Sequence, residues 1–158
     1  DVYADIATSK YLKNNFSYCF KNQKDYPSIL KLNPIKKELI FKDNNKKINI
    51  RSIIVKHGNV DCLSFIINNK LAYASDVSHI YKKDLNKFKN LKYFVLDCLR
   101  FSKHPAHFNY DEVMNIVYKL KPAKTILTNL HSDLDYNYLL KISPNNVIPG
   151  YDGLSFKI

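Results

Sequence analysis

Apolar and polar positions alternate in blocks along the chain, and these blocks predict a mixture of strands and helices. Residues 2–4 form a short apolar run that predicts a strand, and apolar positions recur at helical spacing over residues 8–16. Pro27 and Pro34 deny regular strand pairing to residues 26–35. We therefore expect a loop there, with a short extended piece over residues 29–32.

Two strand pairs are predicted next. Apolar residues 39–41 and 48–55 flank the turn-forming Asp43-Asn44-Asn45, and residues 62–67 and 71–74 flank Asn68-Asn69-Lys70. Short polar connections of this kind join antiparallel strands. The pattern therefore favours two successive hairpins.

Strands and helices alternate in the remainder of the chain. Residues 93–97 form an apolar run that ends in an acid, which is typical of a strand buried on both faces. Asn109 or Asp111 can cap a helix over residues 112–120, and Pro122 ends it. We also expect a strand over 125–127, a short helix over 136–140 and a closing strand over 154–158. Hairpins followed by strand–helix units predict an α/β sandwich.

The bulk composition is that of a folded protein. With 158 residues and 46% apolar content, the chain fits a single domain over 1–158 with a real core. No apolar run approaches the roughly 18–20 residues that span a bilayer, and no signal peptide is present. Cys19, Cys62 and Cys98 are odd in number and lack CxxC spacing, which predicts reduced thiols. These features predict a cytoplasmic protein with no membrane partner.

The charge balance is strongly basic. Lys and Arg number 25 against 14 Asp and Glu, giving a net charge of +11, a field that attracts phosphate-bearing ligands or nucleic acid. The lysines are scattered, as in Lys36-Lys37 and Lys82-Lys83, without the clustered arginines and aromatics of a nucleic-acid groove. We therefore predict a solvated lysine surface and do not expect nucleic acid as a partner.

Three polar groups follow apolar runs. His57 follows residues 53–55, Asp76 follows residues 71–74, and His131 follows residues 125–127. Strand ends gather at one rim of an α/β sheet, where binding sites form, and two imidazoles with a carboxylate suit zinc, manganese or iron. Taken singly, each is more often a satisfied histidine or a turn-forming aspartate. Their common placement favours a metal site.

Two more histidines lie on the loop that precedes the predicted helix. His104 and His107 are candidates for contacting phosphate oxygens or for protonating a leaving group. The alternative is a proline-rigidified turn with solvated rings. His79 begins a predicted surface helix, so we expect it to lie outside any site.

Six short motifs in order along the chain together resemble one protein family. They resemble the metallo-β-lactamase superfamily, in particular its branch of phosphoribosyl cyclic phosphodiesterases. The motifs are Val55-Lys56-His57-Gly58, Leu71-Ala72-Tyr73-Ala74-Ser75-Asp76-Val77, Leu96-Asp97-Cys98-Leu99-Arg100, His104-Pro105-Ala106-His107-Phe108, Ile126-Leu127-Thr128-Asn129-Leu130-His131-Ser132-Asp133-Leu134-Asp135-Tyr136 and Tyr151-Asp152-Gly153-Leu154.

The resemblance implies a fold, a cofactor and a reaction. It implies an αββα sandwich and two divalent metal ions, zinc or manganese, whose bridging water attacks a cyclic or diester phosphate. By resemblance, Asp76 bridges the metals, His57 binds the first and His131 the second, and His107 contacts the substrate. Four further residues would hold these ligands and their loops in place. They are Asp97, His104, Asp135 and Asp152.

The sequence departs from the family pattern at two places. Many relatives carry the last histidine directly after the Thr of the final strand, where this chain has Asn129, and His131 follows two positions later. Because a strand alternates faces, this offset restores the same side. The first motif of the family, His-x-His-x-Asp-His, has no counterpart, since no histidine precedes His57. We therefore expect a C-terminal portion that lacks the first strands and first metal motif, binds metal weakly and turns over little by itself.

Two functional hypotheses follow. The first is a binuclear metal-dependent phosphodiesterase with a small phosphodiester substrate, whose site is completed by an N-terminal segment or within a homo-oligomer. The second is a non-catalytic remnant, or one half of a split protein, that acts as an interaction module. Metal content separates the two hypotheses.

Overall fold

The computed structural model describes residues 1–44 and 46–158, with Asp43 described by its backbone alone. The chain divides into two compact units, residues 1–39 and residues 40–158. No helix in these described ranges is long and apolar enough to cross a membrane.

The smaller unit contains a two-stranded parallel sheet and one α-helix. Strand β1 (Val2–Ala4) pairs with β2 (Leu32–Pro34), and between them lie α1 (Ile6–Asn15) and the 3₁₀ helix η1 (Ser17–Cys19). Asp5 begins α1, because its side chain accepts a hydrogen bond from the Thr8 backbone N–H at 2.7 Å. The predicted first strand and helix are confirmed, whereas the extended piece expected over residues 29–32 lies at Leu32–Pro34, where it pairs with β1.

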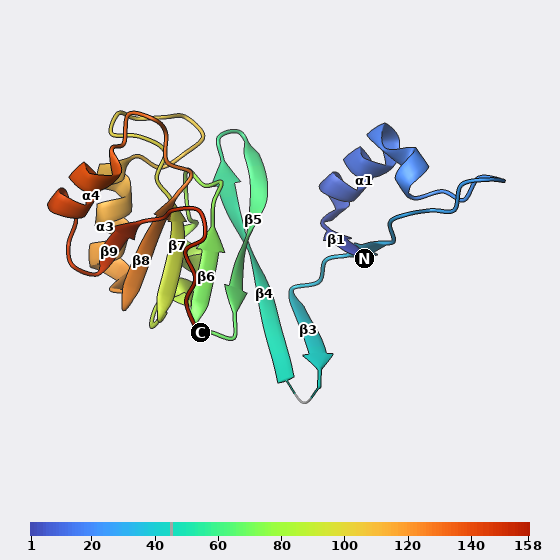
Figure 1. Ribbon diagram of the computed structural model, residues 1–158, viewed down its shortest axis with the longest axis horizontal. Helices are drawn as coiled ribbons and strands as arrows, with labels where there is room; N and C mark the ends of the chain where they lie inside the picture. The colour runs from blue at the N-terminus through green and yellow to red at the C-terminus, as the bar shows by residue number, and fades with distance from the viewer. Residues whose placement is uncertain (45) are drawn as a thin grey trace. The chain divides into compact units, whose positions relative to one another are not determined.

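Seven strands form one mixed sheet in which neighbours in space are also neighbours in sequence (Figure 1). Strand β5 pairs antiparallel with both β4 and β6, and β6 to β9 pair parallel with one another. The strands are β3 (Glu38–Asp43), β4 (Lys46–His57), β5 (Val60–Ile67), β6 (Leu71–Ala74), β7 (Tyr93–Asp97), β8 (Lys124–Thr128) and β9 (Val147–Pro149).

The second predicted hairpin is confirmed, and the backbone conformation of its turn explains why asparagines occur there. Asn68 and Asn69 both have φ in the left-handed region, at 51° and 54°. Asparagine tolerates this conformation better than most residues, and two such residues match the twist of a tight hairpin. The turn predicted at Asp43-Asn44-Asn45 includes Asn45, which lies outside the described residues; β3 and β4 on either side of it are neighbours in the sheet.

The helices of the larger unit follow the strands as expected. The predicted helix is α3 (Tyr110–Leu120), and its cap is Asn109, which forms a reciprocal capping box with Glu112. Lys121 ends it in the left-handed region at φ 51°. The remaining helical segments are α2 (Lys82–Leu85), the 3₁₀ helix η2 (Asn86–Phe88) and α4 (Tyr136–Ile142).

The hydrophobic core lies against one face of this sheet. Ile53 and Val55 of β4 share this face with Phe94 and Leu96 of β7, and all four are buried. A fully buried side chain of this size contributes roughly 1.5–3 kcal/mol. The helical residues that cover them are Val113, Val117 and Leu120 of α3, Leu139 of α4 and Phe88 of η2.

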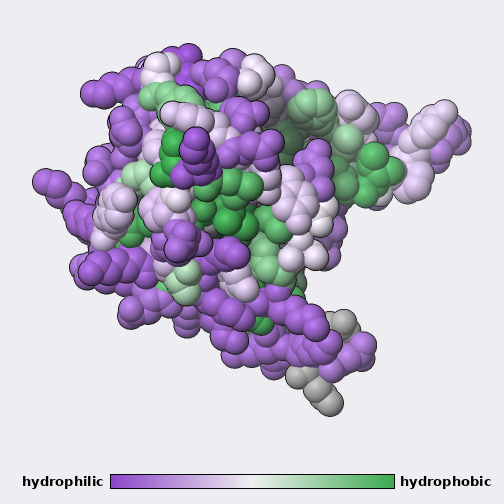
Figure 2. Space-filling model, turned by 60° about the vertical axis from the view of Figure 1, so that its left-hand side comes forward, coloured by the Kyte–Doolittle hydropathy of each residue, from purple (hydrophilic) through white to green (hydrophobic). Residues whose placement is uncertain are grey.

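The opposite face of the sheet is also apolar, but its strand residues do not belong to the core cluster of the described chain. Strand register places Phe65, Tyr73, Val95 and Ile126 in one row across this face, which we call the open face, and Tyr73 is 44% exposed. In the next row on the same face, Ile54 of β4 is 51% exposed. Figure 2 shows a largely hydrophilic surface on which apolar side chains gather in patches.

The closing strand predicted over residues 154–158 is wrong. This segment pairs with no strand; it lies along the open face, where the Phe156 ring stacks on Tyr93 at 4.4 Å between centroids. A groove of about 480 Å³ lies between this segment and the open face, and its walls include Leu154 and Val95. The last strand is instead β9, which is only three residues long and itself ends in Pro149, so its sequence does not predict a strand.

Candidate metal centre

The ends of four strands meet at one edge of the large sheet. Because β4 and β6 are both antiparallel to β5, β4 runs in the direction of β6, β7 and β8. His57 is the last residue of β4, Asp97 is the last of β7, Asp76 follows β6 by two positions, and Asn129 follows β8 directly. Four polar side chains are thereby brought to one edge.

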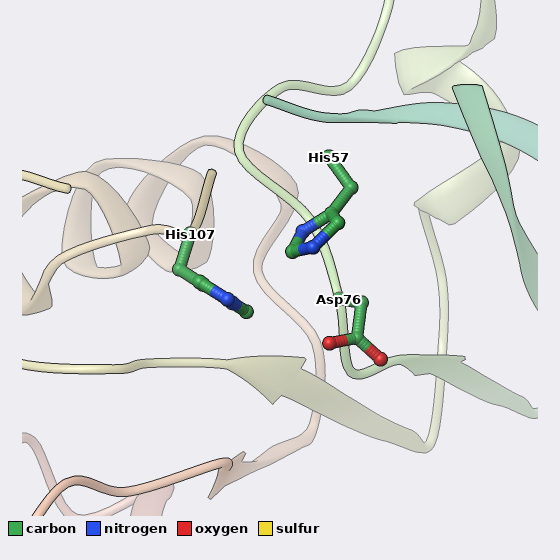
Figure 3. A group of neighbouring side chains, drawn as sticks. All are labelled: His57, Asp76 and His107. Atoms are coloured by element: carbon green, nitrogen blue, oxygen red, sulfur yellow. The ribbon is translucent and has the colours of Figure 1, made fainter. Parts of the chain in front are cut away.

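Three side chains converge at this edge. The ligand atoms of His57, Asp76 and His107 all lie within 4.8 Å of one another, and Figure 3 shows the three side chains pointing toward a common point. The two histidines are half-buried and Asp76 is exposed. The rings of His57 and His107 meet edge to face at 4.6 Å between centroids.

The backbone of a neighbouring loop fixes the tautomer of His57. Its Nδ1 donates a hydrogen bond to the carbonyl oxygen of Ala106 at 2.8 Å. The loop comes this close because Gly58 has no side chain: a Cβ at Gly58 would lie 3.2 Å from the Cβ of Ala106, and the φ of Gly58 is +59°. With Nδ1 protonated, Nε2 keeps its lone pair.

A buried carboxylate fixes the tautomer of His107, again with the proton on Nδ1. Nδ1 of His107 donates to Oδ2 of Asp97 at 2.7 Å, and the Asp97 side chain is fully buried. Burial raises the pKa of Asp97, while hydrogen bonds from the Val77 backbone N–H and from His107 oppose the rise. A carboxylate behind a histidine in this way orients the ring and increases the basicity of its other nitrogen.

His104 lies beside His107 but is held differently. The two ring centroids are 5.1 Å apart, and Nδ1 of His104 accepts a hydrogen bond from the backbone N–H of Ala106 at 3.2 Å. Partial burial lowers the pKa of His104, and the positive charge of Arg100 lowers it further. The ring therefore favours its neutral form.

The three converging side chains fit a divalent metal ion. Two ligand atoms of one zinc ion, each bonded at 2.0–2.1 Å, lie at most about 4.2 Å apart. Atoms within 4.8 Å of one another are close to this limit, so side-chain rotation is enough to bring them onto one ion. Both histidines present Nε2 with its lone pair, and three protein ligands are the usual number at a zinc site that keeps one position for water.

His131 does not join this group. Its side chain is 59% exposed and its Nδ1 pairs with Asp133 at 2.7 Å. Side chains alternate between the two faces only within a strand, so the two-residue offset places His131 on the expected face only if the strand continues to it. Strand β8 ends at Thr128, and Asn129 then turns the chain with φ 62°. The structure therefore brings His107, and not His131, together with His57 and Asp76.

The other predicted positions are dispersed. Asp135 caps α4 by accepting from the Tyr138 backbone N–H at 2.7 Å, and Asp152 is exposed on the wall of the groove of the open face. His79 is exposed and packs edge to face on Tyr81. Of the residues expected to hold the ligands and their loops in place, Asp97 contacts His107 directly, and His104 lies beside His107.

Asn129 has a role that sequence reasoning did not assign. Its amide nitrogen donates to Oδ1 of Asp97 at 3.2 Å and to the carbonyl oxygen of Ser75 at 3.4 Å. It thereby links the ends of β6, β7 and β8 behind His107. In the sequence, the position of Asn129 directly after a predicted strand could have indicated this role.

The mixed α/β sheet thus carries a His–Asp–His group at the edge where its parallel strands end. Residues 1–129 match the family model described as beta-lactamase superfamily domain, and the chain belongs to that family. The family and fold class predicted from the motifs are thereby confirmed. No curated protein sequence matches the chain.

Several solved structures share the fold. A diphosphatase from the PhnP family superposes with a TM-score of 0.84 at 24% identity, over 99% of this chain and 57% of that one. The metallo-β-lactamase fold protein YhfI from Bacillus subtilis gives 0.70 at 15% identity, over 96% and 62%. Zn²⁺-bound PqqB from Methylobacterium extorquens gives 0.74 at 10% identity, over 99% and 64%. The chain thus spans between 57% and 64% of the lengths of these proteins.

Proposed function

We propose that this chain contributes part of the active site of a metal-dependent phosphodiesterase. The observation that carries the proposal is the convergence of His57, Asp76 and His107 within 4.8 Å. Nδ1 of each histidine is engaged by a partner on the protein, so both rings present Nε2 to the same point. This arrangement supports a metal site, because metal-binding histidines characteristically have their other ring nitrogen held by a partner on the protein.

Each residue has a defined part in the proposed site. His57 and His107 supply neutral imidazole nitrogens, and Asp76 supplies a carboxylate oxygen at the exposed side. Two nitrogens and one oxygen suit zinc better than magnesium or calcium, and they also accept manganese. When bound, the metal lowers the pKa of a coordinated water and neutralises charge on phosphoryl oxygens. Asp97 and Asn129 keep His107 in its binding orientation.

The choice of a phosphodiester substrate rests on relatives, on charge and on the openness of the site. One solved structure of the same fold is a diphosphatase of the PhnP family, and the motifs of this chain resemble the phosphodiesterase branch. The net charge of +11 attracts anionic substrates to the protein. A small phosphate diester also suits a site that is open on the Asp76 side.

We further propose that another polypeptide segment completes the site by docking on the open face. The motif resemblance implies that this segment carries the His-x-His-x-Asp-His ligands. The open face offers half-exposed apolar side chains, Ile54 and Tyr73, next to the edge where the ligands converge. Between 36% and 43% of the length of the related structures has no counterpart in this chain, which is enough for such a segment.

A second candidate function is a non-catalytic interaction module. The observation that favours it is Asn129, which occupies the position where many relatives carry the last histidine and donates its amide to Asp97. His131, the expected substitute, pairs with Asp133 at the surface. A module of this kind would use the open face without the metal.

Metal binding and hydrolysis distinguish the two functions. The purified chain is titrated with zinc, and the chain joined to a segment carrying His-x-His-x-Asp-His is assayed on bis(p-nitrophenyl) phosphate. We expect Asp76→Ala to lower zinc affinity and to reduce hydrolysis at least 100-fold, because it removes a ligand from the cluster. Asp133→Ala, at an exposed carboxylate outside both the cluster and the groove of the open face, is the matched control. Hydrolysis retained in Asp76→Ala, or a wild-type chain that takes up no zinc, would sink the proposal.

A further inference from the structure

The loop between β7 and α3 holds His104 in a fixed place. The guanidinium of Arg100 donates to the carbonyl oxygens of Ser102 at 3.3 Å and Lys103 at 2.7 Å. The ends of the loop are tied as well, since the Leu99 N–H donates to the carbonyl of Phe108 at 2.9 Å. His104 is therefore part of an ordered loop that also carries His107.

The three histidines at this edge are held in two opposite tautomers. His57 and His107 donate through Nδ1, to Ala106 O and Asp97 Oδ2, and so keep a lone pair on Nε2. His104 accepts at Nδ1 from the Ala106 N–H, so its neutral ring carries the proton on Nε2. A nitrogen that carries a proton cannot bind a cation, but it can donate to an anion.

We propose that His104 is a substrate-contacting residue that donates its Nε2–H to a phosphoryl oxygen of the diester bound at the His57–Asp76–His107 cluster. The inference rests on the proposed function, because it assumes that the bound substrate is a phosphate ester. It assigns His104 a role distinct from that of its neighbours: two imidazoles bind the metal and the third binds the anion.

The distances suit this division. The centroid of the His104 ring lies 5.1 Å from that of His107, which lies 4.6 Å from that of His57, so the three rings are close neighbours. The backbone of Ala106 contacts two of them, since its N–H donates to His104 and its carbonyl accepts from His57. A metal bound to the cluster and a donor on the neighbouring His104 ring would contact different oxygens of one phosphate group.

The tautomers can be read directly by long-range ¹H–¹⁵N correlation on the histidine side chains. In the metal-free chain we expect the unprotonated nitrogen to be Nδ1 in His104 and Nε2 in His57 and His107. Zinc should shift the Nε2 resonances of His57 and His107 only. Titration with inorganic phosphate should shift Nε2–H of His104, with or without zinc. A proton on Nδ1 of neutral His104 would overturn the inference.

Two amide substitutions separate the nitrogens of His104. His104→Asn keeps a polar atom near Nδ1 but lacks the distal donor, whereas His104→Gln places an N–H near Nε2. We expect His104→Asn to weaken phosphate binding to the zinc-loaded chain about tenfold, the usual effect of losing a hydrogen bond to a charged group, and His104→Gln to recover most of the loss. Zinc affinity should change less than twofold in both. His79→Asn, at an exposed histidine outside the site, should change neither quantity.

The outcomes distinguish this inference from the proposed function. A fall in zinc affinity in both variants would make His104 a metal ligand and overturn the inference, and so would unchanged phosphate binding in His104→Asn. If the wild-type chain takes up no zinc, the proposed metal site fails. The metal-free phosphate titration then decides the inference alone, because a His104 signal that phosphate does not shift overturns it.

Discussion

At the scale of single residues, two aspartate–histidine pairs of equal length have different consequences. Asp97 with His107 and Asp133 with His131 are each joined at 2.7 Å. The Asp97 side chain is fully buried, whereas that of Asp133 is 50% exposed. Water competes for the second pair, and exposed pairs contribute little. Only the Asp97 pair can hold a ring firmly in one orientation.

We therefore expect Asp97→Asn to weaken zinc binding by 10–100-fold, because an amide cannot accept from both the Val77 N–H and His107 Nδ1 while also accepting from Asn129. Isothermal titration with zinc measures the change. Asp133→Asn alters the exposed pair in the same way and should leave the affinity unchanged. Equal losses in the two variants would show that ring orientation by Asp97 is not the cause.

The reactivity of the three cysteine thiols provides a test of how deeply each residue is buried. All three lie in the described part of the chain, and none forms a disulfide. Burial, with a smaller effect of the neighbouring Asp97 charge, raises the pKa of Cys98 to about 12. At pH 8 its thiol is therefore protonated and shielded. We expect Ellman's reagent to modify Cys19 and Cys62 rapidly in the native protein, and Cys98 only after guanidinium is added. Three equally fast thiols would contradict the buried position of Cys98.

The placement of site residues was predictable where a strand rule applies. His57 and Asp76 follow apolar runs, and the rule that such ends share an edge brings them together. The rule does not extend to His131, because the strand stops at Thr128 and Asn129 follows it with a positive φ; the role of His131 as a ligand stays a prediction. The tautomers depend on Ala106 and Asp97, contacts from distant parts of the sequence that no local pattern contains.

At the scale of elements, α3 ends under strain. Lys121 adopts φ 51°, a conformation that disfavours any residue with a Cβ, and glycine is the common choice at this position. We expect Lys121→Gly to stabilise the protein by about 0.5–1 kcal/mol. Lys119→Gly, two positions earlier in the last turn of the same helix, should destabilise it by about 1 kcal/mol. Urea unfolding followed by circular dichroism measures both. Two changes of the same sign would refute this account of the helix end.

Elements with strong local signals were predictable, and short ones were not. The Asn68-Asn69 turn and the Asn109 cap both depend on residues close in sequence, so the local sequence predicts both. Strand β9 has three residues and exists because it pairs with β8. Residues 154–158 have a strand-like composition, yet they pack by side chains on the open face. Both outcomes are decided by tertiary contacts.

At the scale of the whole molecule, the large sheet has two unlike faces. Ile53 and Ile54 are adjacent on β4, yet Ile53 is 3% exposed and Ile54 is 51% exposed. We expect Ile53→Lys to destabilise the chain by about 4 kcal/mol or more, because it places a charge in the core. Ile54→Lys should change stability by less than about 1 kcal/mol. Denaturant titration of the two variants checks this.

The same pair tests the proposed docking. Ile54→Lys should reduce binding of the hydrophobic dye ANS to the native chain, because it places a charge on the open face. It should also prevent a complementing segment from restoring hydrolysis. Unimpaired complementation in Ile54→Lys would place the docking surface elsewhere.

The sequence motifs predicted the family of the whole molecule, since an ordered set of six motifs is far more specific than any one of them.

The strands of the large sheet stand in space in the order in which they occur in the chain. A polypeptide leaving the ribosome could therefore add each new strand to the one just made, without waiting for a distant partner to be translated. Such step-by-step growth keeps loop closures short and folding fast. It also means that an interruption of synthesis within the sheet leaves a smaller sheet with a ready edge rather than an unpaired strand, and such edges recruit neighbouring chains.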